Sequence, residues 1–289
     1  MAIQVKELTH IYSEGLPYEL RALDSISFDV ADGEFMGIIG HTGSGKSTLI
    51  QHLNGLLKPK TGNIIINEVD ITEPNIAMRE IRRKVGLVFQ YPEYQLFEET
   101  VYKDIAFGPQ NLGLSSEEID VRIREALSLV GLDFDEMSQR SPFELSGGQK
   151  RRVAIAGVIA MKPEVLILDE PTAGLDPQTH KDILHMIKEI HKTTGNIVIL
   201  VSHNMTDIAE NCDKVLVLEK GKTLLYGTPK EVFLQKAKLE LSGLDIPPVM
   251  DFMHMLKKRG LDLKEVIFNV DEAAEEIVRA LKYGSEVPS

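Results

Sequence analysis

The chain is poor in cysteine and in clustered positive charge, and each shortage excludes a class of protein. Cys212 is the only cysteine, so no disulfide can form within the chain. This suits a reducing cytosol and leaves core filler as the expected role of that thiol. The formal net charge is −12 and no block of basic residues occurs. Nucleic acid is therefore not expected as a partner, and neither is a polybasic membrane anchor.

Long hydrophobic runs are also missing. No apolar stretch approaches the roughly 20 residues that cross a bilayer, and the first residues lack the basic-then-apolar pattern of a signal peptide. We therefore expect any membrane association to go through another protein. Internal repeats and low-complexity segments are absent, and 43% hydrophobic residues in a chain of 289 can fill the core of one large domain or of two.

One glycine-rich stretch organises the rest of the chain. It reads G-H-T-G-S-G-K-S-T, follows the apolar run 35–39 and precedes an apolar helical pattern at 49–53, so it lies where a buried strand turns into a helix. Backbone N–H groups in such a turn, together with the positive end of the helix, form a phosphate cradle. The alternative is a turn that merely needs small residues. The predicted cradle comprises Gly40, Thr42, Gly43, Ser44, Gly45, Lys46, Ser47 and Thr48.

Two side chains of this cradle carry specific chemistry. Lys46 is expected to reach the β- and γ-phosphates of a nucleotide, and the Ser47 hydroxyl is expected to ligate Mg²⁺.

Polar residues stand at the ends of three apolar strands farther along the chain. Asp169 and Glu170 follow the apolar run 165–168, Gln90 follows 85–89, and His203 follows 196–202. In open α/β sheets ligands collect at the carboxyl ends of strands. Asp169 is then placed to hold Mg²⁺ and Glu170 to polarise an attacking water. Gln90 could touch the metal or water, or simply cap its strand; a lone histidine such as His203 is more often structural, but its position suits a γ-phosphate contact.

A second anion site is predicted where Ser146, Gly147, Gly148 and Gln149 open a helix that runs to residue 160. Because this second cradle has no lysine, we expect it to contact a nucleotide that is held mainly by another chain. An ordinary N-cap at Ser146 is the alternative. Asp176, near the tip of the next tight loop, could contact a facing subunit or cap the helix that starts at Pro177.

Aromatic residues mark two further places. Tyr12 lies in a polar turn, where its ring could stack on adenine or cover the edge of a small antiparallel sheet predicted for residues 1–34. The segment 91–97 is rich in aromatics and begins a helical insertion. It is predicted to be either a docking surface for a partner or the small core of the insertion.

The C-terminal part differs in character from about residue 240 onward. Two short amphipathic helices are predicted, at 249–258 and 271–281. So short an appendage cannot bury much surface alone, and we expect it to pack on the main body or on another subunit.

Taken in order, the phosphate loop, Gln90, the pentapeptide 145–149, the strand 165–170, the loop at Asp176 and His203 resemble the ATP-binding-cassette ATPases over residues 1 to about 235. Segments 40–59 and 151–157 are similar to the energy-coupling factor transporters, and most similar to the second of their paired ATPase subunits. The resemblance implies an α/β fold with a P-loop NTPase (RecA-like) core, an antiparallel β subdomain and a helical subdomain at about 91–160. It also implies a cassette over 1–238 and a C-terminal dimerisation appendage over 239–289.

The resemblance also implies functional roles, with ATP and Mg²⁺ as ligands. Tyr12 would stack on adenine, Gln90 would be the sensor that links the metal to a transmembrane partner, Glu170 would be the general base and His203 the γ-phosphate switch. Ser146 and Gly148 would complete the site of the opposite subunit, and Asp176 would cross the interface.

The implied partners are a second ATPase subunit, a transmembrane coupling subunit and a membrane subunit that captures vitamins or transition-metal ions. The implied place is peripheral, at the cytoplasmic face of the membrane. Three alternatives remain open: another importer of the cassette type, a soluble cassette ATPase of translation or repair, and a small-molecule P-loop kinase or regulatory nucleotide switch. The last would have no use for the pentapeptide 145–149.

Overall fold

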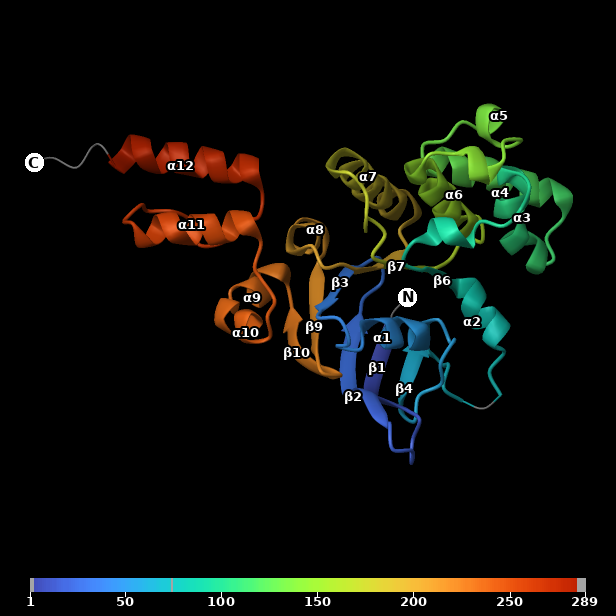
Figure 1. Ribbon diagram of the computed structural model, residues 1–289, viewed down its shortest axis with the longest axis horizontal. Helices are drawn as coiled ribbons and strands as arrows, with labels where there is room; N and C mark the ends of the chain where they lie inside the picture. The colour runs from blue at the N-terminus through green and yellow to red at the C-terminus, as the bar shows by residue number, and fades with distance from the viewer. Residues whose placement is uncertain (1–2, 74, 285–289) are drawn as a thin grey trace, which may run out of the picture.

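A six-stranded sheet forms the centre of the computed structural model, which describes residues 3–73 and 75–284 (Figure 1). Its strand order is β10-β9-β3-β8-β7-β6, and all neighbours are parallel except the edge strand β10, which runs antiparallel to β9. The strands are β3 (Phe35–Gly40), β6 (Val85–Val88), β7 (Val165–Asp169), β8 (Ile197–Val201), β9 (Lys214–Glu219) and β10 (Lys222–Gly227). The α/β class predicted from the sequence is confirmed.

The apolar runs of the sequence become strands that are covered on both faces. Every residue of β3, β6, β7 and β8 is buried or nearly so, as expected for parallel strands packed between two layers. Side chains alternate between the layers, since Leu166 and Leu168 face a core shared with the helices whereas Val165 and Ile167 face a core shared with the second sheet.

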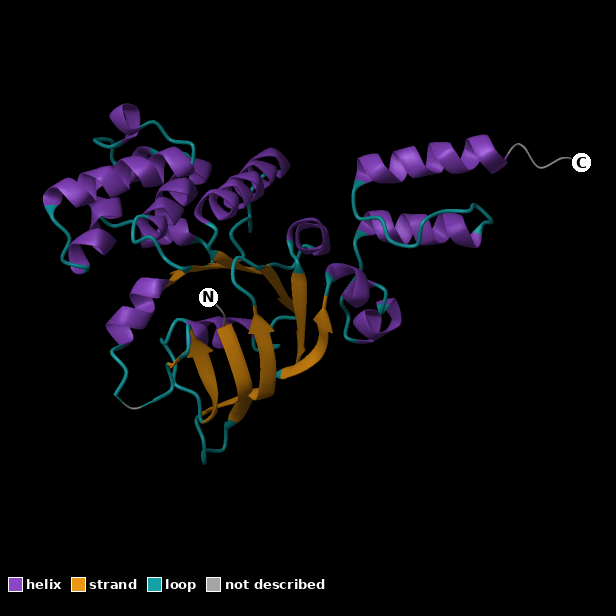
Figure 2. Ribbon diagram, turned by 180° about the vertical axis from the view of Figure 1, so that it is seen from behind, coloured by secondary structure: helices purple, strands orange, loops and turns teal. Residues whose placement is uncertain are grey.

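That second sheet is antiparallel and has the order β2-β1-β4-β5. Its strands are β1 (Ile3–Tyr12), β2 (Leu20–Val30), β4 (Thr61–Ile66) and β5 (Val69–Asp70), and α1 (Lys46–Leu53) packs between the two sheets. Figure 2 shows the strands gathered on one side of the molecule and most of the helices on the other.

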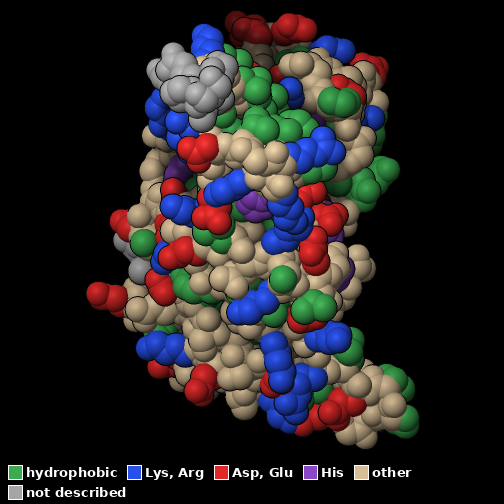
Figure 3. Space-filling model, turned by 90° about the vertical axis from the view of Figure 1, so that its left-hand side faces the viewer, with side chains coloured by type: hydrophobic (Ala, Val, Ile, Leu, Met, Phe, Trp, Pro, Cys, Tyr) green, Lys and Arg blue, Asp and Glu red, His purple; other side chains and the backbone are tan. Residues whose placement is uncertain are grey.

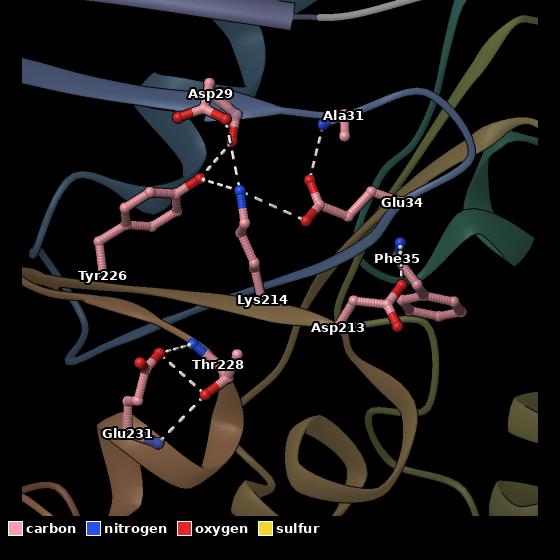
Figure 4. A network of polar contacts seen from close by, with 9 residues as sticks. All are labelled: Asp29, Ala31, Glu34, Phe35, Asp213, Lys214, Tyr226, Thr228 and Glu231. Atoms are coloured by element: carbon pink, nitrogen blue, oxygen red, sulfur yellow. Dashed lines mark hydrogen bonds and ion pairs between the residues drawn. The ribbon is translucent and has the colours of Figure 1, made fainter.

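Lys214 of β9 ties the two sheets together (Figure 4). Its ammonium donates to the Tyr226 hydroxyl at 3.1 Å and to Asp29 Oδ2 of β2 at 3.3 Å, and it lies 3.5 Å from Glu34. The Tyr226 hydroxyl in turn donates to the Asp29 carbonyl. These acceptors raise the pKa of Lys214. Because β3 follows β2 directly and leads into the glycine-rich loop, the network holds in place the segment that precedes this loop.

A cluster of helices stands on the other face of the central sheet. Its members are α3 (Val101–Asn111), α4 (Ser116–Leu129), α5 (Phe134–Met137) and α6 (Gly147–Ile159), with α7 (Pro177–Thr194) beside it (Figure 1). Shorter elements complete the body: α2 (Met78–Lys84), α8 (Met205–Asn211), α9 (Pro229–Phe233), α10 (Lys236–Leu241) and the 3₁₀ turns η1 (Pro92–Gln95) and η2 (Pro142–Glu144).

The C-terminal part forms α11 (Pro248–Lys258) and α12 (Val270–Gly284), which lie side by side and project from the body (Figures 1 and 2). They have a small core of their own around Met253 and Ile267, and Phe268 contacts Phe233 of the body edge-on at 5.8 Å. Of the two expected partners of the appendage, the main body and another subunit, the structure shows a contact with the main body. Among the described residues no helix combines the length and apolar character of a membrane span.

Candidate nucleotide site

The glycine-rich loop connects β3 to α1, as predicted. Gly40 and Gly45 have φ of 154° and 107°, and a Cβ on Gly45 would lie 2.6 Å from the Ala22 carbonyl oxygen. These two positions therefore require glycine. The loop is also held by the β9–β10 turn, because Gly221 N donates to the Ser44 carbonyl at 3.0 Å. The loop backbone therefore has a fixed conformation at the N-terminus of α1, where an anion can bind.

Lys46 lies over this loop and is the cation of the site. Its Nζ donates to the carbonyl oxygens of Gly40 at 2.6 Å and His41 at 3.0 Å, and the residue is only 7% exposed. Burial lowers the pKa of Lys46, and the carboxylates of Glu170 and Asp169 oppose that shift. The structure therefore brings Lys46 and both strand-end acids into one electrostatic unit.

Ser47 and Asp169 meet across the site. Ser47 Oγ donates to Asp169 Oδ2 at 3.5 Å, which joins the first turn of α1 to the end of β7. Asp169 is 8% exposed, and burial raises its pKa against the effects of Lys46 and Ser47. A hydroxyl and a carboxylate oxygen at this separation match the ligand preference of Mg²⁺, which takes few protein oxygens and completes its shell with phosphates and water.

Glu170 and His203 also face each other, at the ends of neighbouring strands β7 and β8. Glu170 Oε1 lies 3.3 Å from His203 Nε2; the carboxylate side chain is 12% exposed and the imidazole 50% exposed. Burial raises the pKa of Glu170 to about 7. Glu170 has a φ of +51°, an uncommon backbone state for a non-glycine residue that turns it away from the strand. A carboxylate with a pKa near 7 suits proton abstraction at neutral pH.

Tyr12 ends β1 and lies beside α1. Its hydroxyl is 3.3 Å from Thr48 Oγ1, its ring contacts His10 edge-on at 4.4 Å, and the residue is 36% exposed. His10 in turn reaches the fully buried His52 of α1, with 3.1 Å between their ring nitrogens. The ring is thus held next to the phosphate loop with one part open to solvent, so adenine stacking stays a prediction.

Gln90 is exposed just beyond the edge strand β6. The segment that follows it is fastened by Arg151, a residue that sequence reasoning did not single out as functional. Arg151 is 1% exposed; it binds both carboxylate oxygens of Glu93, at 2.7 and 3.1 Å, and donates to the carbonyl oxygens of Pro171 at 3.0 Å and Ala173 at 2.8 Å. One guanidinium therefore joins α6 to the segments that follow Gln90 and Glu170.

Ser146 is the N-cap of α6, in a layer apart from the glycine-rich loop. Its hydroxyl accepts from Gln149 N at 3.3 Å while Gln149 Oε1 accepts from Ser146 N at 3.1 Å, a complete capping box. Ser146 and Gly147 are exposed, and a Cβ on Gly147 would meet no atom within 4 Å. The structure thus confirms the N-cap and leaves the turn open to a ligand from outside.

Asp176 is exposed and caps α7, accepting from Gln178 N and Thr179 N at 3.1 Å each. The Thr179 hydroxyl, which donates to Asp176 at 2.6 Å, is the main cause of the lowered pKa of this carboxyl. The predicted helix cap is present, and a contact with a facing subunit stays a prediction.

A groove separate from this site runs between α2, η1, α3 and α6. It measures about 690 Å³ and is lined by three arginines of α2, Arg79, Arg82 and Arg83, and by the edge-on pair Phe97 and Phe107. Of the aromatic segment 91–97, Tyr91, Tyr94 and Phe97 are exposed at 40%, 84% and 55%, whereas Leu96 is buried. The aromatics therefore form a surface and not the core of the insertion.

Comparison with known proteins identifies the family. The ABC transporter family model matches residues 23–173, more than half of the chain. The energy-coupling factor transporter ATP-binding protein EcfA2 of Clostridium tetani is 56% identical over 279 residues, which cover 96% of this chain and 97% of that protein. The protein of the same name from Caldanaerobacter subterraneus subsp. tengcongensis is 57% identical over 282 residues, 98% of each chain.

Solved structures agree with the sequence matches. The structure of cbiO1 from Clostridium perfringens, described as part of the ABC transporter complex cbiONQ, superposes with a TM-score of 0.74 at 39% identity and covers 88% of this chain and 98% of that one. A dimeric post-hydrolysis structure of the ATP-binding cassette MJ0796 bound to ADP and Pi gives 0.69 at 29% identity, covering 78% and 98%. The predicted P-loop ATPase fold is confirmed, and the chain belongs to the ABC transporter ATPases and, within them, to the ATP-binding proteins of energy-coupling factor transporters.

Proposed function

We propose that this ATPase works as one of two protein bodies that hold ATP between them, and that hydrolysis releases the pair. One observation carries the proposal: the cradle of Lys46 and Ser47 and the acids of β7 lie together, whereas the exposed turn at Ser146, at the N-terminus of α6, lies apart from them and has no basic residue among positions 146–149. The related cassette MJ0796 is a dimer bound to ADP and Pi, which supports pairing of this chain. ATP binding then favours the closed pair, because only the closed state supplies both halves.

Mg²⁺ fits the site. Ser47 Oγ and Asp169 Oδ2, 3.5 Å apart, would hold the ion, with Gln90 as a further oxygen ligand at the sheet edge. The ion would supply charge neutralisation at the β- and γ-phosphates. Lys46 would add a second positive charge, and Tyr12 would hold the adenine by stacking.

Hydrolysis follows from the position of Glu170. Its carboxylate takes a proton from water, whose oxygen bonds to the γ-phosphorus while the bond from that phosphorus to the β–γ bridging oxygen breaks, leaving ADP and phosphate. His203, 3.3 Å from Glu170, donates a hydrogen bond to a γ-phosphate oxygen and so orients the water and the phosphate together.

Glu170→Gln tests this assignment. We expect the turnover number to fall by about 10²–10⁴-fold while ATP binding and pairing persist, since the amide keeps shape but cannot accept the proton. In the parent protein the base is ionised only above its pKa of about 7, so the rate should rise with pH up to that value and then level off. Glu189→Gln, an exposed change on α7, is the control. Turnover near the parental rate in Glu170→Gln would refute the general-base role.

We propose docking surfaces for the partner subunits from the exposed charged and apolar side chains of the chain. A transmembrane coupling subunit would dock in the groove of α2 and α3, where Arg82 and Phe107 offer charge and apolar area together. We propose that residues 1–238 act as the cassette and residues 239–289 as the dimerisation appendage. Its exposed Phe252, Met255, Val278 and Leu281 suit a second ATPase subunit, and Figure 3 shows hydrophobic side chains gathered at the free end of this appendage.

We propose that the chain works at the cytoplasmic face of a membrane, in a complex whose membrane subunit captures vitamins or transition-metal ions. The docking groove has its own test. Phe107→Asp should detach the chain from its membrane complex in co-purification while leaving ATP binding intact, because it puts a charge at the centre of the apolar wall. Phe143→Asp changes a ring in η2 that is 60% exposed, against 47% for Phe107, and lies outside the groove, so it should have no such effect. Retention of Phe107→Asp in the complex would move the docking surface elsewhere.

A further inference from the structure

A hydrogen-bonded pair outside the nucleotide site joins two helices that each start at a functional loop. His180 Nε2 lies 2.9 Å from Asp207 Oδ1, although the two residues are 27 positions apart. The pair is largely shielded from water, with side-chain exposures of 22% for His180 and 7% for Asp207. Burial raises the pKa of Asp207, and the hydrogen bond from His180 opposes that shift. The carboxylate is therefore held in place by its contact with the imidazole.

His180 lies in the first turn of α7, which meets two partner-facing segments. The backbone N–H of His180 donates to the Asp176 carbonyl at 2.9 Å, so its position is tied to the Asp176 loop. The preceding residue, Thr179, packs on α6, because a Cβ added to Gly148 would lie 3.0 Å from Thr179 Cγ2. The first turn of α7 is therefore in contact with both the Asp176 loop and the start of α6 beside Ser146.

Asp207 occupies the first turn of α8, which begins at Met205, two residues after His203. The N-cap Asn204 accepts from Thr206 N at 2.9 Å and from Asp207 N at 3.3 Å, so residues 204–207 form one hydrogen-bonded turn. A bond that fixes Asp207 therefore fixes the turn from which His203 projects toward Glu170.

We propose that His180 and Asp207 are positioning residues for His203. By tying α7 to α8, the pair sets the imidazole of His203 against the γ-phosphate when a partner subunit engages the Asp176 loop. The proposal rests on the roles assigned above to Asp176 and His203. Neither member of the pair touches the nucleotide, so the pair should affect turnover and not ground-state binding of ATP.

The test is a double-mutant cycle on the full chain with its partner ATPase present. His180→Ala and Asp207→Ala each remove the hydrogen bond and should each lower kcat by about 10–100-fold, because a shift of about 1 Å in a catalytic group costs that much, with KM for ATP changed less than about twofold. The double variant His180→Ala/Asp207→Ala should lose about as much as either single variant, since the hydrogen bond can be lost only once. His180→Gln and His180→Arg, which keep a donor to the Asp207 carboxylate, should stay within about threefold of the parent.

Controls separate positioning from stability. His185→Gln alters an exposed histidine on the same helix and should leave kcat unchanged. Thermal unfolding of each variant shows whether loss of activity merely follows loss of folded protein. Parental kcat in His180→Ala, or a double variant whose loss equals the product of the two single losses, would overturn the proposal. So would a loss of kcat that a lowered folded fraction accounts for fully.

The same experiment distinguishes this inference from the function on which it rests. Glu170→Gln is measured in parallel. If Glu170→Gln is inactive and His180→Ala is fully active, only the positioning role fails. If Glu170→Gln turns over at the parental rate, the assignment of the catalytic site itself fails.

Discussion

The two anion sites of this chain are built in opposite ways. The site at the glycine-rich loop, called enclosed for its buried cation Lys46, lies against two carboxylates, although residues 41–43 of the loop itself are exposed. The turn at Ser146 is exposed, has no basic residue among positions 146–149 and satisfies its side chains internally through a capping box. In the proposed function the first site binds a triphosphate by itself, whereas the second only completes a site that another subunit provides. The comparison explains why one chain would contain both.

The largest expected effect comes from removing the positive charge of Lys46, which distinguishes the enclosed site from the turn at Ser146. Lys46→Ala deletes the cation of the enclosed site, and we expect hydrolysis to fall by about 10³-fold, because the β- and γ-phosphates lose a charge-assisted contact in a water-poor site. Steady-state ATPase assays and nucleotide titration measure the loss. Lys103→Ala, an exposed lysine paired with Glu99, serves as the control. Near-normal hydrolysis in Lys46→Ala would show that the cation of the enclosed site is not needed for the reaction, contrary to the comparison.

A smaller effect should come from adding charge to the open site. Gly147→Asp fits sterically because no atom lies within 4 Å of its Cβ, and an acid in the first turn of α6 suits the helix dipole. Facing a partner's triphosphate, the same acid should weaken ATP-driven pairing by about 10²-fold in a Glu170→Gln background, by like-charge repulsion.

Binding of ATP to the isolated Gly147→Asp chain should remain normal, because the enclosed site is untouched. Gly147→Ala is the matched control and should pair normally. Analytical ultracentrifugation with ATP reads out the pairing. Undiminished pairing of Gly147→Asp would mean that the turn at Ser146 does not face a nucleotide.

The smallest effect should appear at the edge of the enclosed site. Tyr12→Ala should weaken ATP binding about tenfold, as loss of one stacked base costs about 1–3 kcal/mol. Tyr12→Phe should cost about threefold or less, because it loses only the 3.3 Å contact with Thr48. Comparing ATP with a triphosphate that lacks an aromatic base isolates the stacking. An equal loss for both nucleotides in Tyr12→Ala would refute it.

The sequence predicted those parts of the site that depend on local pattern. The glycine-rich loop and the polar ends of β6, β7 and β8 follow from apolar runs and their flanks, so the loop and the acids of β7 are predictable from local sequence. The bounds of β1 and β2 are not, because register shifts at Val5, Leu8 and His10 interrupt the alternation of the antiparallel sheet predicted for residues 1–34.

Long-range side-chain contacts could not be predicted. Lys150, Arg151 and Arg152 look alike in sequence, and only tertiary packing decides that the middle one is 1% exposed. The pair of His180 and Asp207 is hidden for the same reason, since nothing in either local segment indicates the other. Residues that act through distant partners therefore have no signature in a single sequence.

The four hydrogen bonds of the Arg151 guanidinium give the fold a mechanical property. Its guanidinium is planar and rigid, so α6, the Glu93 turn and the Pro171–Ala173 loop share one joint that transmits displacement without slack. In the proposed docking arrangement, a displacement of the groove wall beside η1 would reach the backbone next to Glu170 through this one residue. The proposed membrane contact and the proposed hydrolysis site would then be separated by the length of one side chain.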